Sequence, residues 1–217
     1  MKITEIYKKF GLPPNLEEHM ARVFAVVSII QKHWKGGLVD WDMAKKMALV
    51  HDIGNVVKMD NKNHPEFLGS EQKNIEYWNQ KQVEMIAKYG EDENEATKLM
   101  LIELGIDPKI VEDVYNKRFV NSIHTSQSNN VSLKILYYAD LRALPLRIGT
   151  LTERIEDIRK RYLNYTSRAD FEDLVNACYE IEKLIQTNLD FDLNDINDEL
   201  VNSGILSNKN LIGNMEI

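Results

Sequence analysis

The sequence has few residues that break helices and no long hydrophobic run. Its 217 residues include ten glycines and five prolines, and so few breakers favour long helices over strands joined by turns. No run of about 18 apolar residues is present that would span a membrane. Residues 1–5 lack the apolar core of a signal peptide. We therefore expect a cytoplasmic protein that does not bind membranes.

Cysteine is almost missing. Cys178 is the single cysteine of the chain, which excludes an intrachain disulfide and a metal cluster held by several thiolates. This composition is compatible with a reducing cytoplasm.

Long tracts of lysine and arginine are absent, and the net charge is −7 at pH 7. We therefore expect no general binding to the nucleic-acid backbone. A small anionic substrate remains open, because a bound metal ion can outweigh the global field locally. The 43% of hydrophobic and 28% of charged residues are typical of an ordinary soluble globular protein.

Apolar residues recur at helical spacing along almost the whole chain. One stripe begins at Leu16 and continues to Ile30, and Asp40 and Ser132 are placed to cap two later helices. The sequence contains no alternating strand pattern and no internal repeat. It therefore predicts an all-α fold.

The length suits one domain, or one domain with an appended helical hairpin. We expect a metal-binding helical domain over residues 1–165, followed by an amphipathic helix and a loosely attached tail over residues 166–217. The apolar spacing weakens beyond Asp190, where Asn and Asp accumulate. The apolar stripe from Phe171 to Ile185 needs a partner. It caps the core, covers the substrate opening or forms a homodimer interface, and the periodicity does not distinguish these.

An adjacent histidine and aspartate end one apolar helical pattern. His51 extends the face formed by Ala44, Met47 and Ala48, so its ring is expected to point into the bundle, with Asp52 beside it. Such groups are costly on an apolar face unless something binds them. A divalent metal ion fits this mixture of nitrogen and oxygen ligands best. The alternative for His51 is a core histidine with one satisfied hydrogen bond.

Asp140 lies on the buried stripe of its own helix, in line with Leu133, Leu136 and Tyr137. An unpaired carboxylate there would cost several kcal/mol. It is therefore paired with a lysine or arginine from another helix, or it binds a metal ion. The presence of His51 and Asp52 favours the metal.

His19, the His51-Asp52 doublet and Asp140, in this order on helices, resemble the HD-domain superfamily of metal-dependent phosphohydrolases. The resemblance covers residues 16–162. The segment that contains His124 and Asp140 is similar to the branch with two extra histidines. That branch holds a two-metal centre and includes symmetrical dinucleoside-tetraphosphate hydrolases.

The resemblance implies an HD-domain helical bundle with appended C-terminal helices. Its activity would be the hydrolysis of a phosphate ester or anhydride in a small nucleotide-like substrate by metal-activated water. One or two divalent ions are expected: iron, manganese, cobalt or nickel suit the ligands, and zinc is also compatible. If two ions bind, Asp52 bridges them, and the remaining ligands divide into His19, His51 and Asp140 for one ion and His64 and His124 for the other.

Positively charged side chains near these motifs would orient the substrate. Arg142 is the first choice for a catalytic role because it follows Asp140 closely, and the substrate-binding candidates are Lys58, Arg22 and Arg147. Members of the superfamily often carry lysine after His-Asp-Ile-Gly, where this chain has Asn55. The phosphate contact of that lysine is therefore missing or relocated.

Two other functions remain open. HD-like helical folds also hold di-iron centres that activate oxygen, so the protein could be an oxygenase. It could also be a binding or signalling module with weak catalysis, which the Asn55 replacement favours.

Overall fold

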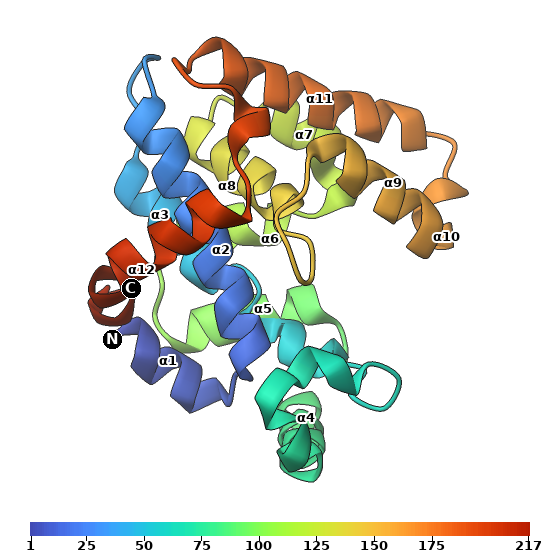
Figure 1. Ribbon diagram of the computed structural model, residues 1–217. Helices are drawn as coiled ribbons and strands as arrows, with labels where there is room; N and C mark the ends of the chain where they lie inside the picture. The colour runs from blue at the N-terminus through green and yellow to red at the C-terminus, as the bar shows by residue number, and fades with distance from the viewer. The chain divides into compact units, whose positions relative to one another are not determined.

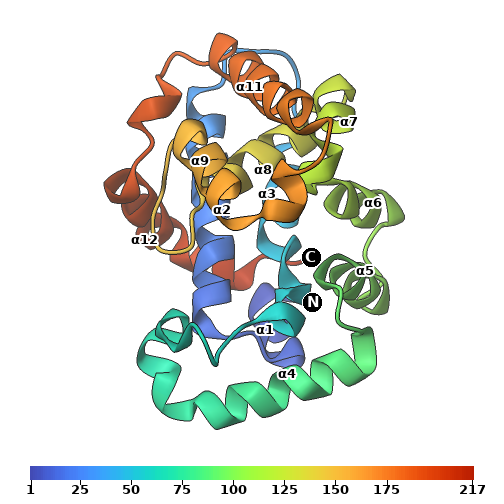
Figure 2. The same ribbon diagram turned by 90° about the vertical axis from the view of Figure 1, so that its right-hand side faces the viewer.

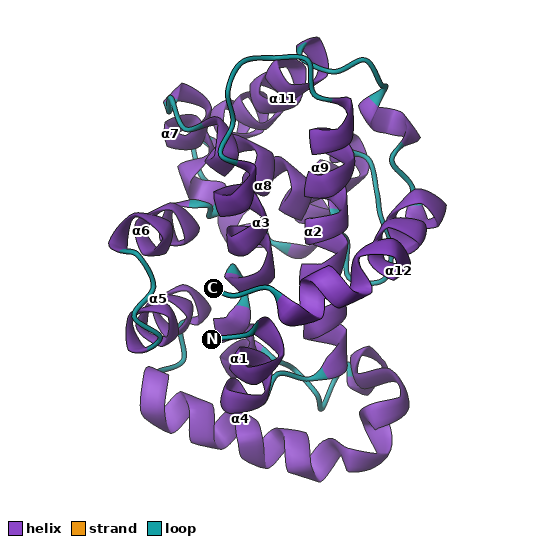
Figure 3. Cartoon of the chain, turned by 90° about the vertical axis from the view of Figure 1, so that its left-hand side faces the viewer, coloured by secondary structure: helices purple, strands orange, loops and turns teal.

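The structure is a computed structural model that describes residues 1–217, and all of its regular elements are helices. Figure 3 shows these helices joined by loops, without a strand. The α-helices are α1 (Ile3–Phe10), α2 (Pro14–His33), α3 (Trp41–Val50), α4 (Ile75–Tyr89), α5 (Glu93–Glu103), α6 (Pro108–Asn116), α7 (Ser122–Gln127), α8 (Val131–Arg142), α9 (Leu151–Arg161), α10 (Leu163–Thr166), α11 (Phe171–Thr187) and α12 (Asp198–Asn214). The 3₁₀ helices are η1 (Ile53–Lys58), η2 (Pro65–Asn74), η3 (Phe119–Asn121) and η4 (Leu193–Asp195). The all-α prediction is confirmed.

The chain forms two compact units, each assembled from separate stretches of sequence. Unit 1 contains Met1–Ala21, Leu49–Tyr115 and Asn208–Ile217, and unit 2 contains Arg22–Ala48 and Asn116–Ser207. Residues on both sides of position 165 belong to unit 2, and the domain boundary expected there stays a prediction.

Side-chain caps fix the beginnings of several helices. The expected cap Asp40 is confirmed at α3, where its Oδ1 accepts a hydrogen bond from the Met43 amide at 2.9 Å. At α5 the Asp92 carboxylate accepts two backbone amides. At α9 the side chains of Thr150 and Glu153 each bind the other's backbone amide. These caps satisfy amides that have no partner inside the helix.

In unit 1, η1 packs closely against α5. The Gly54 amide donates a hydrogen bond to Thr97 Oγ1 at 3.0 Å. A Cβ atom at Gly54 would overlap the backbone of Thr97 and the Glu93 carbonyl. The absence of a side chain at Gly54 therefore allows the segment after His51 and Asp52 to lie directly on α5.

The two ends of the chain lie side by side in unit 1 (Figure 1). Lys2 and Glu216 form an isolated antiparallel bridge. The Ile3 amide donates to the Met215 carbonyl at 3.0 Å, and the Ile217 amide donates to the Met1 carbonyl at 3.1 Å. Backbone hydrogen bonds thus hold the C-terminal residues beside the start of α1.

In unit 2, α11 supplies the apolar stripe that required a partner, and α7, α8 and α9 cover it (Figure 2). Its side chains Phe171, Leu174 and Ile185 are buried. Cys178 is also buried, and its Sγ lies 3.4 Å from the Tyr137 hydroxyl. The stripe is therefore part of the core of unit 2.

The segment after Asp190 is attached through buried contacts, in contrast to the loosely attached tail expected from its composition. Leu193, Ile196 and Val201 are buried. The Arg142 guanidinium donates hydrogen bonds to the Leu193 and Ile196 carbonyls at 2.8 and 2.9 Å. Few apolar residues are needed to attach this segment, because the buried Arg142 also binds its backbone.

Candidate metal centre

His51 and Asp52 form the turn between α3 and η1. The last residues of α3 are completely buried, and His51 itself is only 2% exposed. The Tyr7 hydroxyl donates a hydrogen bond to the Leu49 carbonyl at 2.7 Å, which satisfies an acceptor at the end of α3. Burial, together with the nearby Glu17 carboxylate, raises the pKa of Tyr7. The phenol therefore stays protonated and holds the helix end that carries His51.

Three potential ligand atoms converge within unit 1. His19 Nε2 lies 3.2 Å from His51 Nε2 and 3.5 Å from Asp52 Oδ2. His51 Nε2 lies 3.7 Å from the same Asp52 oxygen. Nitrogen and oxygen ligands about 2.0–2.2 Å from one ion are separated from each other by roughly 3 to 4 Å. The residues present therefore fit a transition metal ion, in both spacing and donor type.

Asn55 binds the carboxylate of this cluster. Its Nδ2 donates a hydrogen bond to Asp52 Oδ2 at 2.5 Å, and its backbone amide donates to the Asp52 carbonyl at 2.9 Å. A carboxylate oxygen can accept this bond and still face a cation, because each oxygen carries two lone pairs. Asn55 thus fixes the orientation of Asp52 from the position where the superfamily often has lysine.

Asp140 lies on α8, half-buried, and it has the cationic partner that the sequence offered as one of two alternatives. Lys117 Nζ donates a hydrogen bond to Asp140 Oδ2 at 2.9 Å. Asp140 also belongs to a group with His19, His51 and Asp52 in which each residue offers one ligand atom, and these atoms all lie within 4.8 Å of one another. These four residues form a candidate site for a divalent metal ion.

The remaining two predicted ligands, His64 and His124, are not members of this group. His64 precedes η2, is exposed, stacks on Phe67 and has its Nδ1 3.1 Å from Glu66 Oε1. His124 lies on α7 and is exposed. The second ion that these histidines would hold stays a prediction.

The predicted substrate-binding cations have partners of their own. Lys58 Nζ lies 3.0 Å from Glu93 Oε1. Arg147 makes two hydrogen bonds to the Glu153 carboxylate, at 3.0 and 3.2 Å. Arg22 donates to the Pro145 carbonyl at 3.0 Å. Contact between these side chains and a substrate stays a prediction.

Arg142, for which the sequence suggested a catalytic role, is buried and hydrogen-bonded within unit 2. It is 1% exposed. Besides the Leu193 and Ile196 carbonyls, its guanidinium binds the Gly149 carbonyl and the Tyr138 hydroxyl. These four hydrogen bonds join α8 to the C-terminal segment, and the catalytic role of Arg142 stays a prediction.

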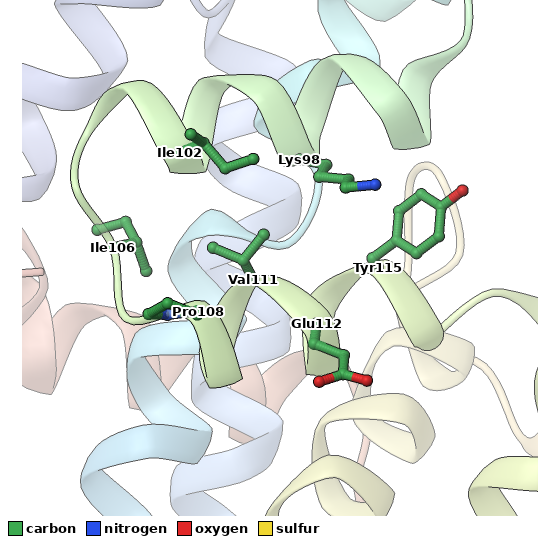
Figure 4. Close-up of a pocket in the computed structure, with 7 residues that line it drawn as sticks. All are labelled: Lys98, Ile102, Ile106, Pro108, Val111, Glu112 and Tyr115. Atoms are coloured by element: carbon green, nitrogen blue, oxygen red, sulfur yellow. The ribbon is translucent and has the colours of Figure 1, made fainter.

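A separate cavity of about 410 Å³ lies in unit 1 between α5 and α6. Figure 4 shows Ile102, Ile106 and Val111 along its apolar part, and Lys98 and Tyr115 at one end. None of the predicted site residues lines it. The cavity is therefore distinct from the candidate metal centre.

A family model, described as HD domain, matches residues 16–142. The chain belongs to the HD-domain family. The matched region contains all four residues of the candidate site and ends at Arg142. No curated protein and no solved structure matches the chain significantly. The predicted similarity to dinucleoside-tetraphosphate hydrolases thus stays a prediction.

None of the helices combines the length and the apolar character needed to cross a lipid bilayer.

Two contacts that shape the site of this HD-domain protein could not be predicted from the sequence. Lys117 is one of many charged residues and lies 23 positions before its partner Asp140. The replacement at Asn55 was visible, but its hydrogen bond to Asp52 was not. Both contacts depend on side-chain directions that spacing alone does not define.

Proposed function

We propose that this HD-domain protein is a metal-dependent phosphohydrolase that cleaves a phosphate ester or anhydride of a small nucleotide-like substrate. The observation that carries the proposal is the convergence of two imidazole nitrogens and one carboxylate oxygen within 3.7 Å of one another. Two imidazoles and a carboxylate seldom meet in a largely buried place unless they bind a cation.

His19, His51, Asp52 and Asp140 would hold the ion. When bound, a divalent ion lowers the pKa of a coordinated water and offsets negative charge on phosphoryl oxygens. Manganese, iron, cobalt or nickel suits these ligands, and zinc is compatible.

The protein's own residues contribute orientation and exclusion of water. The buried end of α3 fixes the His51 ring, and Asn55 fixes the Asp52 carboxylate. Because His51 is surrounded by buried apolar side chains, charge interactions at this site are stronger than in bulk water. This arrangement suits a reaction in which negative charge shifts between phosphoryl oxygens.

The test is elemental analysis of the purified full-length protein, followed by phosphate release from a panel of nucleotides with added Mn²⁺. We expect bound metal and measurable turnover of at least one nucleotide. Asp52→Asn should abolish turnover. Asp42→Asn is the matched control, because Asp42 lies on the exposed side of α3 and pairs with Lys46, and it should leave turnover unchanged.

Other results would favour the alternatives. Oxygen consumption by a coloured iron form, without phosphate release, would favour a di-iron oxygenase. Tight nucleotide binding without turnover in any metal would favour a binding or signalling module. A metal content near two ions per chain would support His64 and His124 as ligands, whereas a content near one would limit the site to the four residues above.

A further inference from the structure

The cavity between α5 and α6 has the size of a small-molecule site. Its volume is about 410 Å³, within the range of roughly 300–1,000 Å³ that is typical of ligand pockets. All of its lining residues lie between positions 98 and 115, which belong to unit 1. The shape of the cavity therefore depends on α5, α6 and the loop between them.

The lining residues of α6 lie on one face of that helix. They follow the spacing i, i+3, i+4 and i+7, which places side chains on the same side: Pro108, Val111, Glu112 and Tyr115. Figure 4 shows α6 opposite α5 across the cavity. Glu112 is thus a carboxylate on a face that otherwise presents apolar and aromatic side chains.

The body of the cavity is apolar. Ile106 and Val111 are 9% and 6% exposed. Ile102 lies across from Val111 (Figure 4) and is 55% exposed, although it borders a cavity. A ligand with an apolar body would remove this surface of Ile102 from water, which is favourable.

The two charged residues that line the cavity differ in their partners. Lys98 Nζ lies 3.7 Å from Glu95 Oε2 and 4.6 Å from the centre of the Tyr115 ring. Glu95 also accepts a hydrogen bond from the Tyr115 hydroxyl at 2.5 Å. In contrast, Glu112 is exposed, and no cation of the chain pairs with it. The uncompensated charge at the cavity is therefore negative.

We propose that this cavity binds a small organic ammonium, whose apolar body lies between Ile102, Ile106 and Val111 and whose positive charge pairs with Glu112. A carboxylate of the same size would be repelled by Glu112, and Glu95 offsets the attraction of Lys98. The net charge of −7 acts in the same direction. None of these residues belongs to the candidate metal centre, so the proposal does not depend on the proposed function.

Three probes with one apolar chain test the charge preference. The wall of α6 from Pro108 to Tyr115 is about 10 Å long at 1.5 Å per residue, a length that an octyl chain spans. Octylammonium, octanol and octanoate share this chain and differ in the charge of the head group. Each is titrated calorimetrically into the full-length protein with a chelator present, so that no head group binds a metal ion.

We expect octylammonium to bind more tightly than octanol, and octanoate to bind about tenfold more weakly than octylammonium. The location of the bound chain is measured by NMR on isotope-labelled isoleucine methyl groups. The signals of Ile102 and Ile106 should shift as octylammonium is added.

Glu112→Gln should weaken octylammonium binding about threefold, the contribution of an exposed ion pair, and leave octanol binding unchanged. Glu76→Gln is the matched control. Glu76 is also an exposed glutamate on a helix of unit 1, α4, but it does not line the cavity. This control should change the affinity for none of the probes.

Ile102→Ser should weaken the binding of all three probes by a similar factor, about threefold, because it removes apolar contact without changing charge. Its control is Val83→Ser on α4, where the side chain is 64% exposed and lies outside the cavity lining. Ile102 and Glu112 are both exposed, so the two test variants should fold.

Lys98→Met separates an ammonium site from an anion site. It removes the only cation among the lining residues, so octylammonium should bind about twofold to threefold more tightly. An anion site built on Lys98 would instead prefer octanoate in the unsubstituted protein and lose that preference in the variant.

Octanoate binding as tight as that of octylammonium would overturn the proposal, as would an unchanged octylammonium affinity in Glu112→Gln. The absence of methyl shifts at Ile102 and Ile106 would also overturn it. If no probe binds and Ile102→Ser converts a dimer into monomers in sedimentation, the cavity face is an interface between copies and the proposal is wrong. All of these results leave the proposed function intact.

Discussion

Gly54 and Thr97 join the turn formed by His51 and Asp52 to α5, through a hydrogen bond of 3.0 Å from the Gly54 amide to Thr97 Oγ1. Thr97 Oγ1 in turn donates to the Glu93 carbonyl at 2.8 Å. The glycine that follows His51, Asp52 and Ile53 is thus explained by packing: a larger residue would force η1 away from α5. The position of Asp52 depends on that contact, because Asp52 immediately precedes η1.

Replacing Gly54 by alanine should destabilise the protein. The added methyl group meets backbone atoms of α5 that cannot rotate away, and overpacking of this kind costs about 1–3 kcal/mol. Gly37→Ala is the matched control, since no atom lies within 4 Å of its added Cβ. It should change stability by less than about 1 kcal/mol. Urea unfolding followed by circular dichroism measures both, and equal midpoints would contradict the packing role of Gly54.

A second prediction concerns the buried arginine. Arg142→Met removes the donor for the Gly149, Leu193 and Ile196 carbonyls. Buried acceptors without a donor are costly, so we expect a loss of roughly 2–4 kcal/mol in the free energy of unfolding. Chemical denaturation gives this value directly.

Arg159→Met is the matched control for Arg142→Met. Arg159 also makes two good hydrogen bonds, at 2.7 and 2.8 Å to the Glu172 carboxylate, but this pair is exposed. Exposed ion pairs contribute at most about 1 kcal/mol. Similar losses in both variants would show that the burial of Arg142 is not what makes it important.

The sequence predicted the helical fold and the members of the candidate site because both depend on local patterns. Helical period places His51 and Asp140 on buried faces, and the structure confirms that the fold is all-α. The buried environment of Arg142 could not be predicted from its closeness to Asp140 in the sequence, because closeness in sequence is not closeness on a helix. Residues two positions apart, such as Asp140 and Arg142, point about 200° apart around the axis.

Contacts between segments that are distant in the chain could not be predicted from the sequence. The pairing of Lys117 with Asp140 is one example, and the backbone bonds of Arg142 to the C-terminal segment are another. Helix starts were also shifted: α8 is capped by Asn130, whose Oδ1 accepts from the Leu133 amide, instead of by Ser132. Both residues are good caps, so only the packing of α8 decides between them.

Acid should remove the contribution of Glu153 to stability. Hydrogen bonds from Arg147, and from the Thr150 backbone, lower the pKa of Glu153 to about 2. A carboxyl group whose pKa is lower in the folded than in the unfolded state stabilises the fold above its unfolded pKa, and this contribution is lost as the pH falls towards the folded pKa. Unfolded Glu has a pKa of about 4.3, so the loss occurs between about pH 4 and pH 2.

Comparison with Glu153→Gln isolates that contribution. At pH 6 the unsubstituted protein should be more stable than the variant, and the difference should shrink as the pH is lowered from 4 to 2. Urea unfolding at several pH values measures it. A stability difference that stays constant down to pH 2 would contradict the lowered pKa.

Metal binding should stabilise the protein, and it should do so through His51. An ion that binds the folded state alone raises the free energy of unfolding, by about 2.7 kcal/mol when its concentration is 100 times its Kd. We therefore expect added Mn²⁺ to raise the melting temperature and a chelator to lower it. His51→Gln should remove most of this shift, because it replaces the buried imidazole at 3.2 Å from His19 with an amide, a weaker ligand.

His33→Gln is the control for that measurement. His33 lies on the same chain segment as His19, the helix α2, but its Nδ1 is 3.0 Å from Asp190 and its ring stacks on Phe191. The variant should keep the full Mn²⁺-dependent shift in melting temperature. If His33→Gln and His51→Gln respond to Mn²⁺ in the same way, the ion binds away from the doublet, because only one of the two histidines belongs to the group of four candidate ligands.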